Sequence, residues 1–248
     1  MQIIISPARK MTVDPDGLPY RDLPKFLPQA QEILDYLKER SLAELQAIWQ
    51  CSDRLVRTNA ANLQAFDLER NLTPALLAFT GPQYLAMGPG VFTDAEWAYV
   101  QAHLRILSGF YGVLRPLDGI VNYRLGLSDR AQVAGTTDLY QYWGDRIAQA
   151  VFGEGNLILN LASQEYAKAI RPYLTPQQTL VTCTFGRLVA GKVKQQSTRA
   201  KQARGNMVRF LATNQVDDLA QVKNFTTGGY AFQPAWSTPT NLVFVQEG

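Results

Sequence analysis

This 248-residue chain is poor in the residues that build metal and redox sites. It contains one histidine and two cysteines, Cys51 and Cys183, which lie far apart in the sequence. A zinc site or a disulfide framework needs more of these side chains at closer spacing. No clustered Asp/Glu spacing indicates a carboxylate metal site either. We therefore expect two unlinked, mostly buried thiols, no metal and no cofactor.

Long apolar runs and low-complexity tracts are also lacking. No stretch reaches the roughly 18 consecutive apolar residues that mark a membrane span. The N-terminal sequence MQIIISPARK has neither the basic start nor the long apolar region of a signal peptide. With no linker or internal repeat to divide it, the chain is predicted to form a single cytoplasmic domain over residues 1–248.

The signature motifs of the commoner enzymes are missing as well. The chain has no P-loop, no dinucleotide-binding fingerprint, no nucleophile elbow and no zinc signature. These absences count against the commoner enzyme classes, but they leave unfamiliar chemistry open.

Acidic residues are absent from one long window of the chain. Between Tyr166 and Val216 there are nine basic residues and no acid, so the other 15 of the 24 basic residues face all 21 acids elsewhere. The nine are Lys168, Arg171, Arg187, Lys192, Lys194, Arg199, Lys201, Arg204 and Arg209. Such a window forms either a solvated helix face beside an acidic surface or an anion-binding surface, and we favour the second.

Hydrophobic patterning predicts strands and helices that mix without a strict βαβ rhythm. Strands are expected at residues 2–6, 75–81, 157–163 and 241–246, with a β-hairpin formed by residues 179–186 and 187–194. Helices are expected at 32–40, after the capping boxes Ser41/Glu44 and Thr93/Glu96, after Ser163, and at 197–214. We predict an α+β (irregular α/β) fold with a mixed sheet.

The segment SGFYG follows the second capping box, whose helix is expected to run to Leu107. Gly109 and Gly112 punctuate a turn there, and their amides predict a helix-hairpin-helix-like element that holds a DNA phosphate. The two glycines are three residues apart rather than the usual two, but Arg105 and Arg115 flank the turn and support the interpretation. His103 borders the apolar stripe of the helix and is predicted to be a boundary residue, not a catalyst.

The segment KQARGNMVRF places two basic side chains, Lys201 and Arg204, on one helix face. Gly205 lies inside the same helix, where glycine costs about 1 kcal/mol relative to alanine. Its presence indicates that another backbone or a ligand approaches closely. Two aromatic strings can stack on bases, although a core position is favoured for them: Tyr140, Tyr142, Trp143, Tyr230, Phe232 and Trp236.

Seven blocks occur in an order typical of one bacterial family. They are IISPARK, SDRLVRTNAAN, HLRILSGFYGVLRPLDGIVNYRL, DLYQYWGD, LILNLASQEY, KQARGNMVRF and GGYAF. The chain resembles the peroxide stress protein YaaA family over essentially its full length. The resemblance implies a single-domain α/β fold with a positively charged cleft, a helix-hairpin-helix-like element, and binding to duplex or locally melted DNA. It also implies a cytosolic role in hydrogen peroxide stress that limits damage linked to unincorporated iron.

The resemblance also carries residues over to this chain. Matching positions are Asn59, Arg105, Arg115, Arg124, Tyr140, Trp143, Asp145, Asn160, Ser163, Lys201, Arg204, Gly205 and Arg209. Three residues depart from the pattern, because Gly126, Gln164 and Gly228 stand where the resemblance leads us to expect acids. These departures put any carboxylate-based activity in doubt.

The leading hypothesis is a DNA-binding protein whose affinity is mainly electrostatic and independent of sequence. Its candidate contacts are Arg105, Gly109, Gly112, Arg115, Arg124, Lys192, Lys194, Arg199, Lys201, Arg204 and Arg209. Arg105, Arg115 and Arg124 are expected to stay solvated at the wall of a cleft. The first alternative is an enzyme acting on a nucleotide or damaged nucleic acid, with Asp145, Glu165 and Arg115 as candidates. The second alternative is an interaction module that docks an acidic protein partner.

Overall fold

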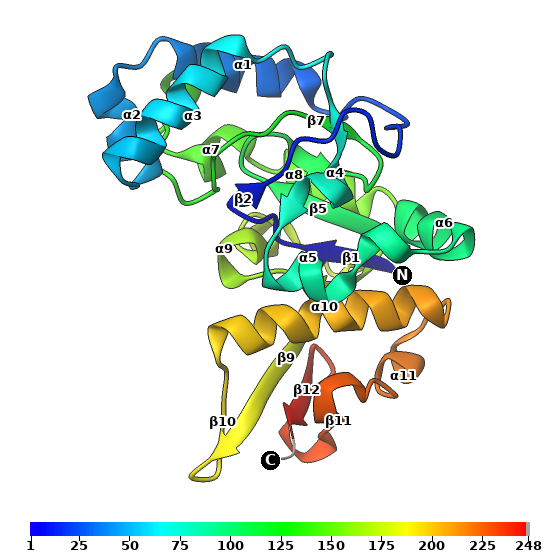
Figure 1. Cartoon of the computed structure of the whole chain (residues 1–248). Helices are drawn as coiled ribbons and strands as arrows, with labels where there is room; N and C mark the ends of the chain where they lie inside the picture. Colours follow the sequence, from blue (N-terminus) through cyan, green and yellow to red (C-terminus); the bar gives the residue numbers. More distant parts are fainter. Residues whose placement is uncertain (247–248) are drawn as a thin grey trace.

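A mixed β-sheet runs through the centre of the protein, as the computed structural model of residues 1–246 shows (Figure 1). The strands are β1 Gln2–Ile5, β2 Lys10–Met11, β3 Thr73–Pro74, β4 Phe79–Thr80, β5 Leu104–Ser108, β6 Gly112–Leu114, β7 Gly119–Ile120, β8 Leu157–Leu161, β9 Thr179–Val189, β10 Lys192–Lys194, β11 Tyr230–Phe232 and β12 Asn241–Gln246. Within residues 1–246 the main sheet has the order β11-β12-β9-β8-β1-β5-β6, and β10 pairs with β9. Parallel pairs in the middle and antiparallel pairs at the edges confirm the predicted α+β class with a mixed sheet.

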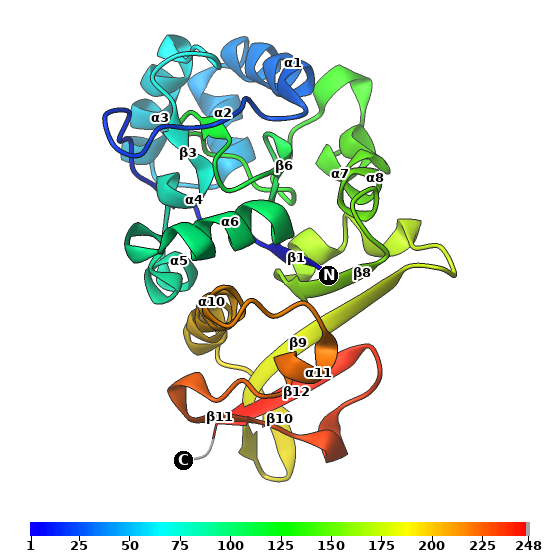
Figure 2. The ribbon, with the colours of Figure 1, turned by 90° about the vertical axis from the view of Figure 1, so that its right-hand side faces the viewer.

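The helices surround this sheet on several sides. They are α1 Leu27–Lys38, α2 Leu42–Trp49, α3 Asp53–Ala65, α4 Ala75–Ala78, α5 Pro82–Met87, α6 Asp94–His103, α7 Leu139–Trp143, α8 Arg146–Phe152, α9 Gln164–Ala167, α10 Ser197–Thr213 and α11 Leu219–Val222. Helices α1 to α3 gather at one end of the molecule, and β9, β11 and β12 lie at the other end (Figures 1 and 2). The long helix α10 crosses between the two ends, alongside α5. None of the helices described here is long and apolar enough to cross a membrane.

The central strands are apolar on both faces, as expected of parallel strands that are covered on both sides. The side chains from Ile3 to Ile5 on β1 are fully buried, and one connected hydrophobic core extends from them to Phe244 on β12. Both cysteines are free thiols as predicted, with Cys183 buried and Cys51 half-buried. Burial raises the pKa of the Cys183 thiol well above its usual range.

The predicted helix from the second capping box is too long. Thr93 and Glu96 do form the capping box of α6, but the helix ends at His103 and the chain continues as β5. Residues Leu104 to Ile106 pair with Ile3 to Ile5 of β1, and this pairing outweighs the helical spacing of the apolar residues. His103 lies at the boundary of the core as predicted, with Nδ1 3.0 Å from the Met1 carbonyl oxygen.

The prediction of a helix-hairpin-helix-like element is therefore wrong, because the SGFYG segment is the turn of a β-hairpin between β5 and β6. The glycines have steric causes: a Cβ on Gly109 would lie 2.7 Å from the backbone of Gly126, and Gly112 adopts a φ of +71° against the Trp143 ring. Both glycines are buried. The amides of Phe110 and Tyr111 donate to Ser108 Oγ, so neither of these two amides is free for a phosphate.

Two further elements differ from their predictions in detail, and a third agrees. Residues 75–81 form α4 and the two-residue strand β4 rather than one strand. The β-hairpin predicted within residues 179–194 is present, but β9 runs on to Val189 and the turn into β10 lies at Ala190 and Gly191 rather than after Gly186. Helix α10 agrees with the predicted basic helix to within one residue. Local patterns thus located the hairpin and the basic helix, whereas the ends of the strands depended on pairing partners elsewhere in the chain.

Gly205 brings α10 into backbone contact with α5. A Cβ at this position would lie 2.0 Å from the Gln83 carbonyl oxygen and 3.0 Å from the Met87 amide nitrogen. Backbone atoms cannot move aside as a flexible side chain can. The close approach predicted from the sequence is thus made by another segment of backbone, and it fixes α10 at a short distance from α5.

Replacing Gly205 with alanine is expected to destabilise the protein. The steric clash with α5 lowers the free energy of unfolding by about 2 kcal/mol, and this outweighs the greater helix propensity of alanine. Urea unfolding measures the change. Gly90→Ala is the matched control, since a Cβ there meets nothing within 4 Å and should leave stability nearly unchanged. Equal midpoints for both variants would contradict the close contact.

Candidate functional site

The carboxyl ends of β1 and β8 lie side by side in the middle of the sheet. Ile5 pairs with Leu161 at the last position of both strands. The chain leaves β1 to return as β5 on one side, and it leaves β8 to return as β9 on the opposite side. In open sheets, ligands bind in the crevice that opens where successive connections diverge in this way. The ends of β1 and β8 are therefore a candidate position for a ligand site.

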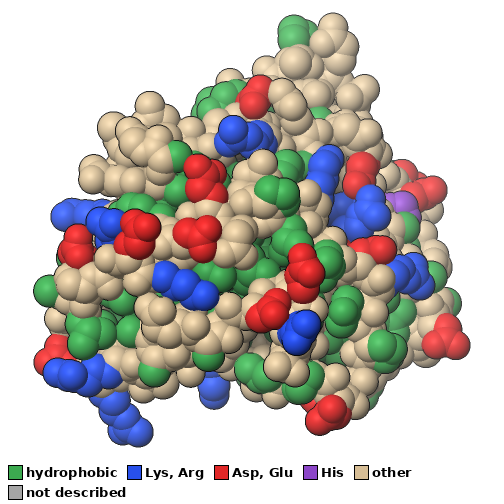
Figure 3. Space-filling model, turned by 90° about the horizontal axis from the view of Figure 1, so that it is seen from above, with side chains coloured by type: hydrophobic (Ala, Val, Ile, Leu, Met, Phe, Trp, Pro, Cys, Tyr) green, Lys and Arg blue, Asp and Glu red, His purple; other side chains and the backbone are tan. Residues whose placement is uncertain are grey.

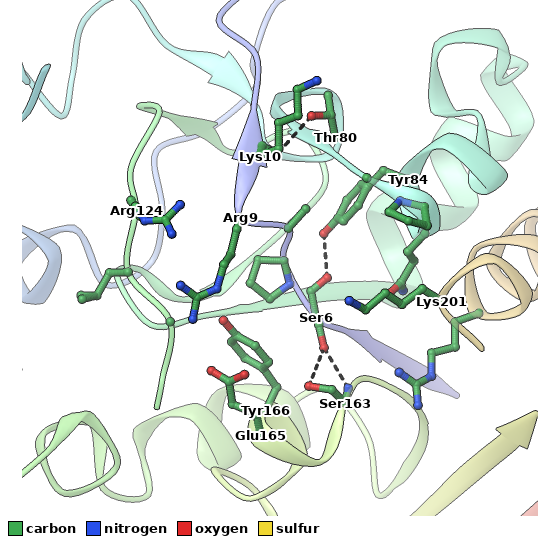
Figure 4. A pocket seen from close by; sticks show the side chains of 18 of the residues that line it. Ser6, Arg9, Lys10, Thr80, Tyr84, Arg124, Ser163, Glu165, Tyr166 and Lys201 are labelled. Carbon is green, nitrogen blue, oxygen red and sulfur yellow. Dashed lines mark hydrogen bonds between the residues drawn. The ribbon is translucent and has the colours of Figure 1, made fainter. Parts of the chain in front are cut away.

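Hydrogen bonds tie the two strand ends together at this point (Figure 4). The Ser163 amide donates to Ser6 Oγ at 2.8 Å, and Ser6 Oγ lies 3.3 Å from Ser163 Oγ. The Tyr84 hydroxyl, on α5, donates to the Ser6 carbonyl oxygen at 2.9 Å. Ser163 occupies the N-cap position of α9 as predicted, but its side chain faces Ser6 and makes no capping hydrogen bond.

A cleft with a volume of about 660 Å³ opens above these serines. Its walls come from the loop after β1, the start of α5, the segment from Tyr123 to Asp129, the start of α9 and the first half of α10. The charged side chains of its lining are Arg9, Lys10, Arg124, Asp129, Glu165, Lys201 and Arg204. Five cations and two carboxylates thus line one cavity, and Figure 4 labels Arg9, Arg124, Glu165 and Lys201 among them.

Four of these cations have no acidic partner among the described residues. Within residues 1–246, no ion pair is formed by Lys10, Arg124, Lys201 or Arg204. The Nε atoms of Arg124 and Arg204 are buried without a hydrogen-bond acceptor, and burial lowers the pKa of the Arg204 guanidinium. Leaving a guanidinium partly buried and unpaired is costly, and an anionic ligand would remove that cost.

The two carboxylates converge on Gly126 from different elements. A Cβ on Gly126 would lie 3.0 Å from Glu165 Oε1 and 3.6 Å from Asp129 Oδ2. Asp129 is only 3% exposed, and its carboxylate accepts from the Gly126 amide at 2.7 Å and from Arg9 at 3.2 Å. Burial raises the pKa of Asp129, while the Gly126 hydrogen bond and Arg9 oppose the rise. Glu165 accepts hydrogen bonds from the Ser128 amide and hydroxyl.

Of the three arginines expected at the wall of the cleft, Arg105 and Arg115 lie outside it. Arg105 is 4% exposed, pairs with Glu154 and donates to the carbonyl oxygens of Gln101, Ala102 and Leu104. Arg115 is half-exposed and pairs with the same Glu154 at 3.1 Å. The expectation that Arg105 is solvated is wrong, because an arginine on a central strand must be satisfied inside the protein. Only Arg124 of the three lines the cleft.

The other predicted contacts are distributed over several surfaces. Arg209 pairs with Glu96 at 3.4 Å and does not line the cleft. Lys192, Lys194 and Arg199 are exposed on the β9–β10 hairpin and at the start of α10. The face of the molecule in Figure 3, seen from above the view of Figure 1, has acidic and basic side chains interspersed. On that face the described residues build no continuous basic surface.

Of the three catalytic candidates, only Glu165 lies in the cleft. Asp145 is exposed at the start of α8 and accepts a hydrogen bond from Gln149 at 2.6 Å. The carboxyl whose pKa burial raises to about 7 is Asp118, which accepts from the Arg115 amide and lies outside the cleft. Three of the six aromatic residues that could stack on bases are buried in the core, the position favoured from the sequence: Tyr142, Trp143 and Tyr230. Trp143 Nε1 donates to the Gly109 carbonyl oxygen, and Trp236 is exposed.

Sequence reasoning missed several residues of the cleft. They are Ser6, Arg9, Lys10, Tyr84, Asp129 and Tyr166. A usable signal was present for the first three, because the polar block SPARK follows a fully apolar strand, and residues after parallel strands collect at one sheet edge. The remaining three come from distant segments that only the folded chain brings to this edge.

The structure is that of an α+β protein with a charged cleft at the carboxyl ends of parallel strands. A family model described as peroxide stress protein YaaA matches residues 1–236. A UPF0246 protein of Limosilactobacillus reuteri is 51% identical over 245 residues, which cover 98% of each chain. A UPF0246 protein of Lactiplantibacillus plantarum is 47% identical over 247 residues and 100% of each chain. The chain therefore belongs to the peroxide stress protein YaaA family, which supports a role in peroxide stress.

Two of the three residues that depart from the family pattern line cavities of the structure. Gly126 lies in the cleft between Glu165 and Asp129, and Gln164 lines an adjoining pocket on the far side of α9. Gly228 lies elsewhere, in a turn with a φ of +75° whose carbonyl oxygen accepts from Gln246. The uncharged residues at 126 and 164 make both cavities less acidic than the resemblance predicts.

Replacement with methionine is expected to change the stability of the protein in opposite directions at Arg105, which is buried, and at Arg204, which is partly buried. Arg105→Met leaves Glu154 and several carbonyl oxygens without their partner, and the free energy of unfolding should fall by about 3 kcal/mol. Arg204→Met removes a guanidinium without an ion pair and should raise the free energy of unfolding by about 1 kcal/mol. Chemical denaturation of both variants beside the wild type measures the difference. A loss of stability in Arg204→Met as large as in Arg105→Met would show that Arg204 is structural.

Proposed function

We propose that this protein binds single-stranded or locally melted DNA during hydrogen peroxide stress, and thereby helps limit the damage linked to unincorporated iron. Membership in the peroxide stress protein YaaA family supports the role in peroxide stress. The cleft supports the DNA-binding part. As in the sequence-based hypothesis, contact is made mainly to phosphates and does not depend on base sequence.

The observation that carries the proposal is the set of unpaired cations in one cleft. Arg124 comes from the segment after Tyr123, and Lys201 and Arg204 come from α10, and all three face a common cavity without acidic partners among the described residues. A solvated helix face would explain an exposed Lys201, but not guanidinium nitrogens that are buried without acceptors. Phosphate oxygens accept from arginine in bidentate geometry and match this requirement.

The dimensions of the cleft favour an unpaired strand over a duplex. A cavity of about 660 Å³ lies within the roughly 300–1,000 Å³ range of sites that enclose a drug-sized ligand. One nucleotide has that size, whereas a double helix is far wider. Proteins that act on or hold individual bases take them out of the stack for the same reason. Lys192, Lys194 and Arg199 lie exposed along the adjoining hairpin and helix and can continue the phosphate track.

Fluorescence anisotropy of labelled single-stranded, bubble and duplex DNA tests this proposal. We expect binding that weakens steeply with salt and is tighter for the single strand and the bubble than for the duplex. The double variant Lys201→Ala/Arg204→Ala removes about two phosphate contacts and should reduce the slope of log affinity against log salt by about 1.4.

The control variant is Arg54→Ala/Arg57→Ala, which makes the same charge change on the exposed surface of α3. It should bind like the wild type. Equal losses in both double variants would mean that general charge attraction, not the cleft, accounts for binding. No binding to any of the DNAs at low salt would refute the proposal.

A second candidate function is catalysis on a nucleotide or damaged nucleic acid in the same cleft. The specific observation is the pair of carboxylates, Asp129 and Glu165, beside the unpaired cations. Burial that raises the pKa of Asp129 favours a proton donor there, and Glu165 at the cleft wall favours a base. No covalent nucleophile is part of this proposal.

Mass spectrometry tests the enzymatic candidate. The protein is incubated with nucleotides and with oligonucleotides that carry oxidised bases, and products are compared with a sample containing Glu165→Gln. Activity in the wild type should fall about 100-fold or more in the variant, because acid–base contributions are of this order. Glu39→Gln, exposed on the surface, is the control. Unaltered substrates throughout would leave binding as the function.

A further inference from the structure

A second cavity adjoins the cleft and shares one residue with it. It has a volume of about 730 Å³ and lies where β8 has ended while β9 continues beside β12. Arg204, on α10, lines both cavities. A ligand group bound to this guanidinium therefore has one cavity on each side of it.

The lining of the second cavity is polar and lacks carboxylates among the residues described. Its side chains include Asn160, Gln164, Arg171, Thr182, Thr184, Gln195, Arg204 and Asn241. Two pairs of these side chains are held in place across the strands. Asn160 donates to Thr182 Oγ1 at 3.1 Å, and the Thr184 hydroxyl donates to Asn241 Oδ1 at 2.7 Å. Amides and hydroxyls fixed in this way can hydrogen-bond the edges of an uncharged polar ring.

The positive charge in the second cavity also indicates an anionic ligand. Arg171 and Arg204 line it, and within residues 1–246 neither forms an ion pair. The only other ionisable side chain of the lining is Cys183, whose thiol burial keeps protonated. The cavity thus combines two cations with neutral hydrogen-bonding groups, and this is the chemistry of a nucleoside flanked by phosphates.

We propose that the cleft and the adjoining cavity together bind two successive nucleotides of one strand, with the phosphodiester between them on Arg204. One nucleoside occupies the cleft at the ends of β1 and β8, and the next occupies the cavity between β8 and β9. Arg171 meets the phosphate that follows. This inference rests on the proposed function and adds to it the length of strand that is held and the path that the strand takes.

Calorimetry with three small probes tests the two-nucleotide site. The probes are inorganic phosphate, thymidine 3′-monophosphate and the dinucleotide thymidylyl-(3′→5′)-thymidine 3′-monophosphate, each at low salt. We expect the dinucleotide to bind about tenfold more tightly than the mononucleotide, since one or two net hydrogen bonds to a second nucleotide contribute affinity of that order. Arg204→Met should abolish binding of all three probes.

Two variants isolate the second cavity. Asn241→Asp keeps the acceptor for Thr184 but adds a negative charge, and Arg171→Gln removes an exposed cation that makes no hydrogen bond within residues 1–246. Each should remove most of the tenfold preference for the dinucleotide. Each should also leave mononucleotide affinity within about twofold of the wild-type value. The controls Asn224→Asp and Arg57→Gln make the same charge changes on exposed surfaces outside both cavities.

The possible results separate this inference from the proposed function. Mononucleotide and dinucleotide binding of equal strength, or a preference that both variants retain, would overturn the two-nucleotide site while leaving the cleft as a phosphate site. Failure of the wild type to bind any of the three probes would overturn both.

Discussion

Parallel pairing of β1 with both of its neighbours is the interaction on which the rest of the structure depends. Ile4 pairs with Arg105 of β5 on one side and with Asn160 of β8 on the other. This pairing ends the preceding helix at His103, converts the SGFYG segment into a hairpin turn and buries Arg105. It also places Ser6 beside Ser163, and every wall of the cleft is built around those two serines.

The position of α10 is the second constraint, and it follows from a single missing side chain. Gly205 lets α10 lie against the backbone of α5, and the same helix carries Lys201, one turn earlier, and the adjacent Arg204 into the cleft. A longer distance between the two helices would withdraw both cations from the strand ends. Gly205 weakens the helix locally, but it positions Lys201 and Arg204 at the cleft.

The arginines illustrate how differently the same side chain is used within one molecule. Arg105 is buried, and although its Nε has no acceptor within residues 1–246, its terminal nitrogens pair with Glu154 and donate to backbone carbonyl oxygens, so it stabilises the folded protein. Arg204 is partly buried and has no acidic partner, so it costs stability unless an anion is bound. Stability lost at unpaired charges of this kind is a common cost of a binding site.

The sequence by itself determined the mixed α+β class, the capping boxes at Ser41 and Thr93, the basic helix and the close approach at Gly205, because these depend on local patterns and on residue size. It also determined family membership through blocks spread over the whole chain. It could not determine which arginines line the cleft, since Arg105 is paired with the distant Glu154 whereas Arg204 is placed at the cavities by the packing of α10. Asp129, Tyr84 and the cavity shared at Arg204 were likewise decided only by the tertiary structure, because strands far apart in sequence end there at one edge of the sheet.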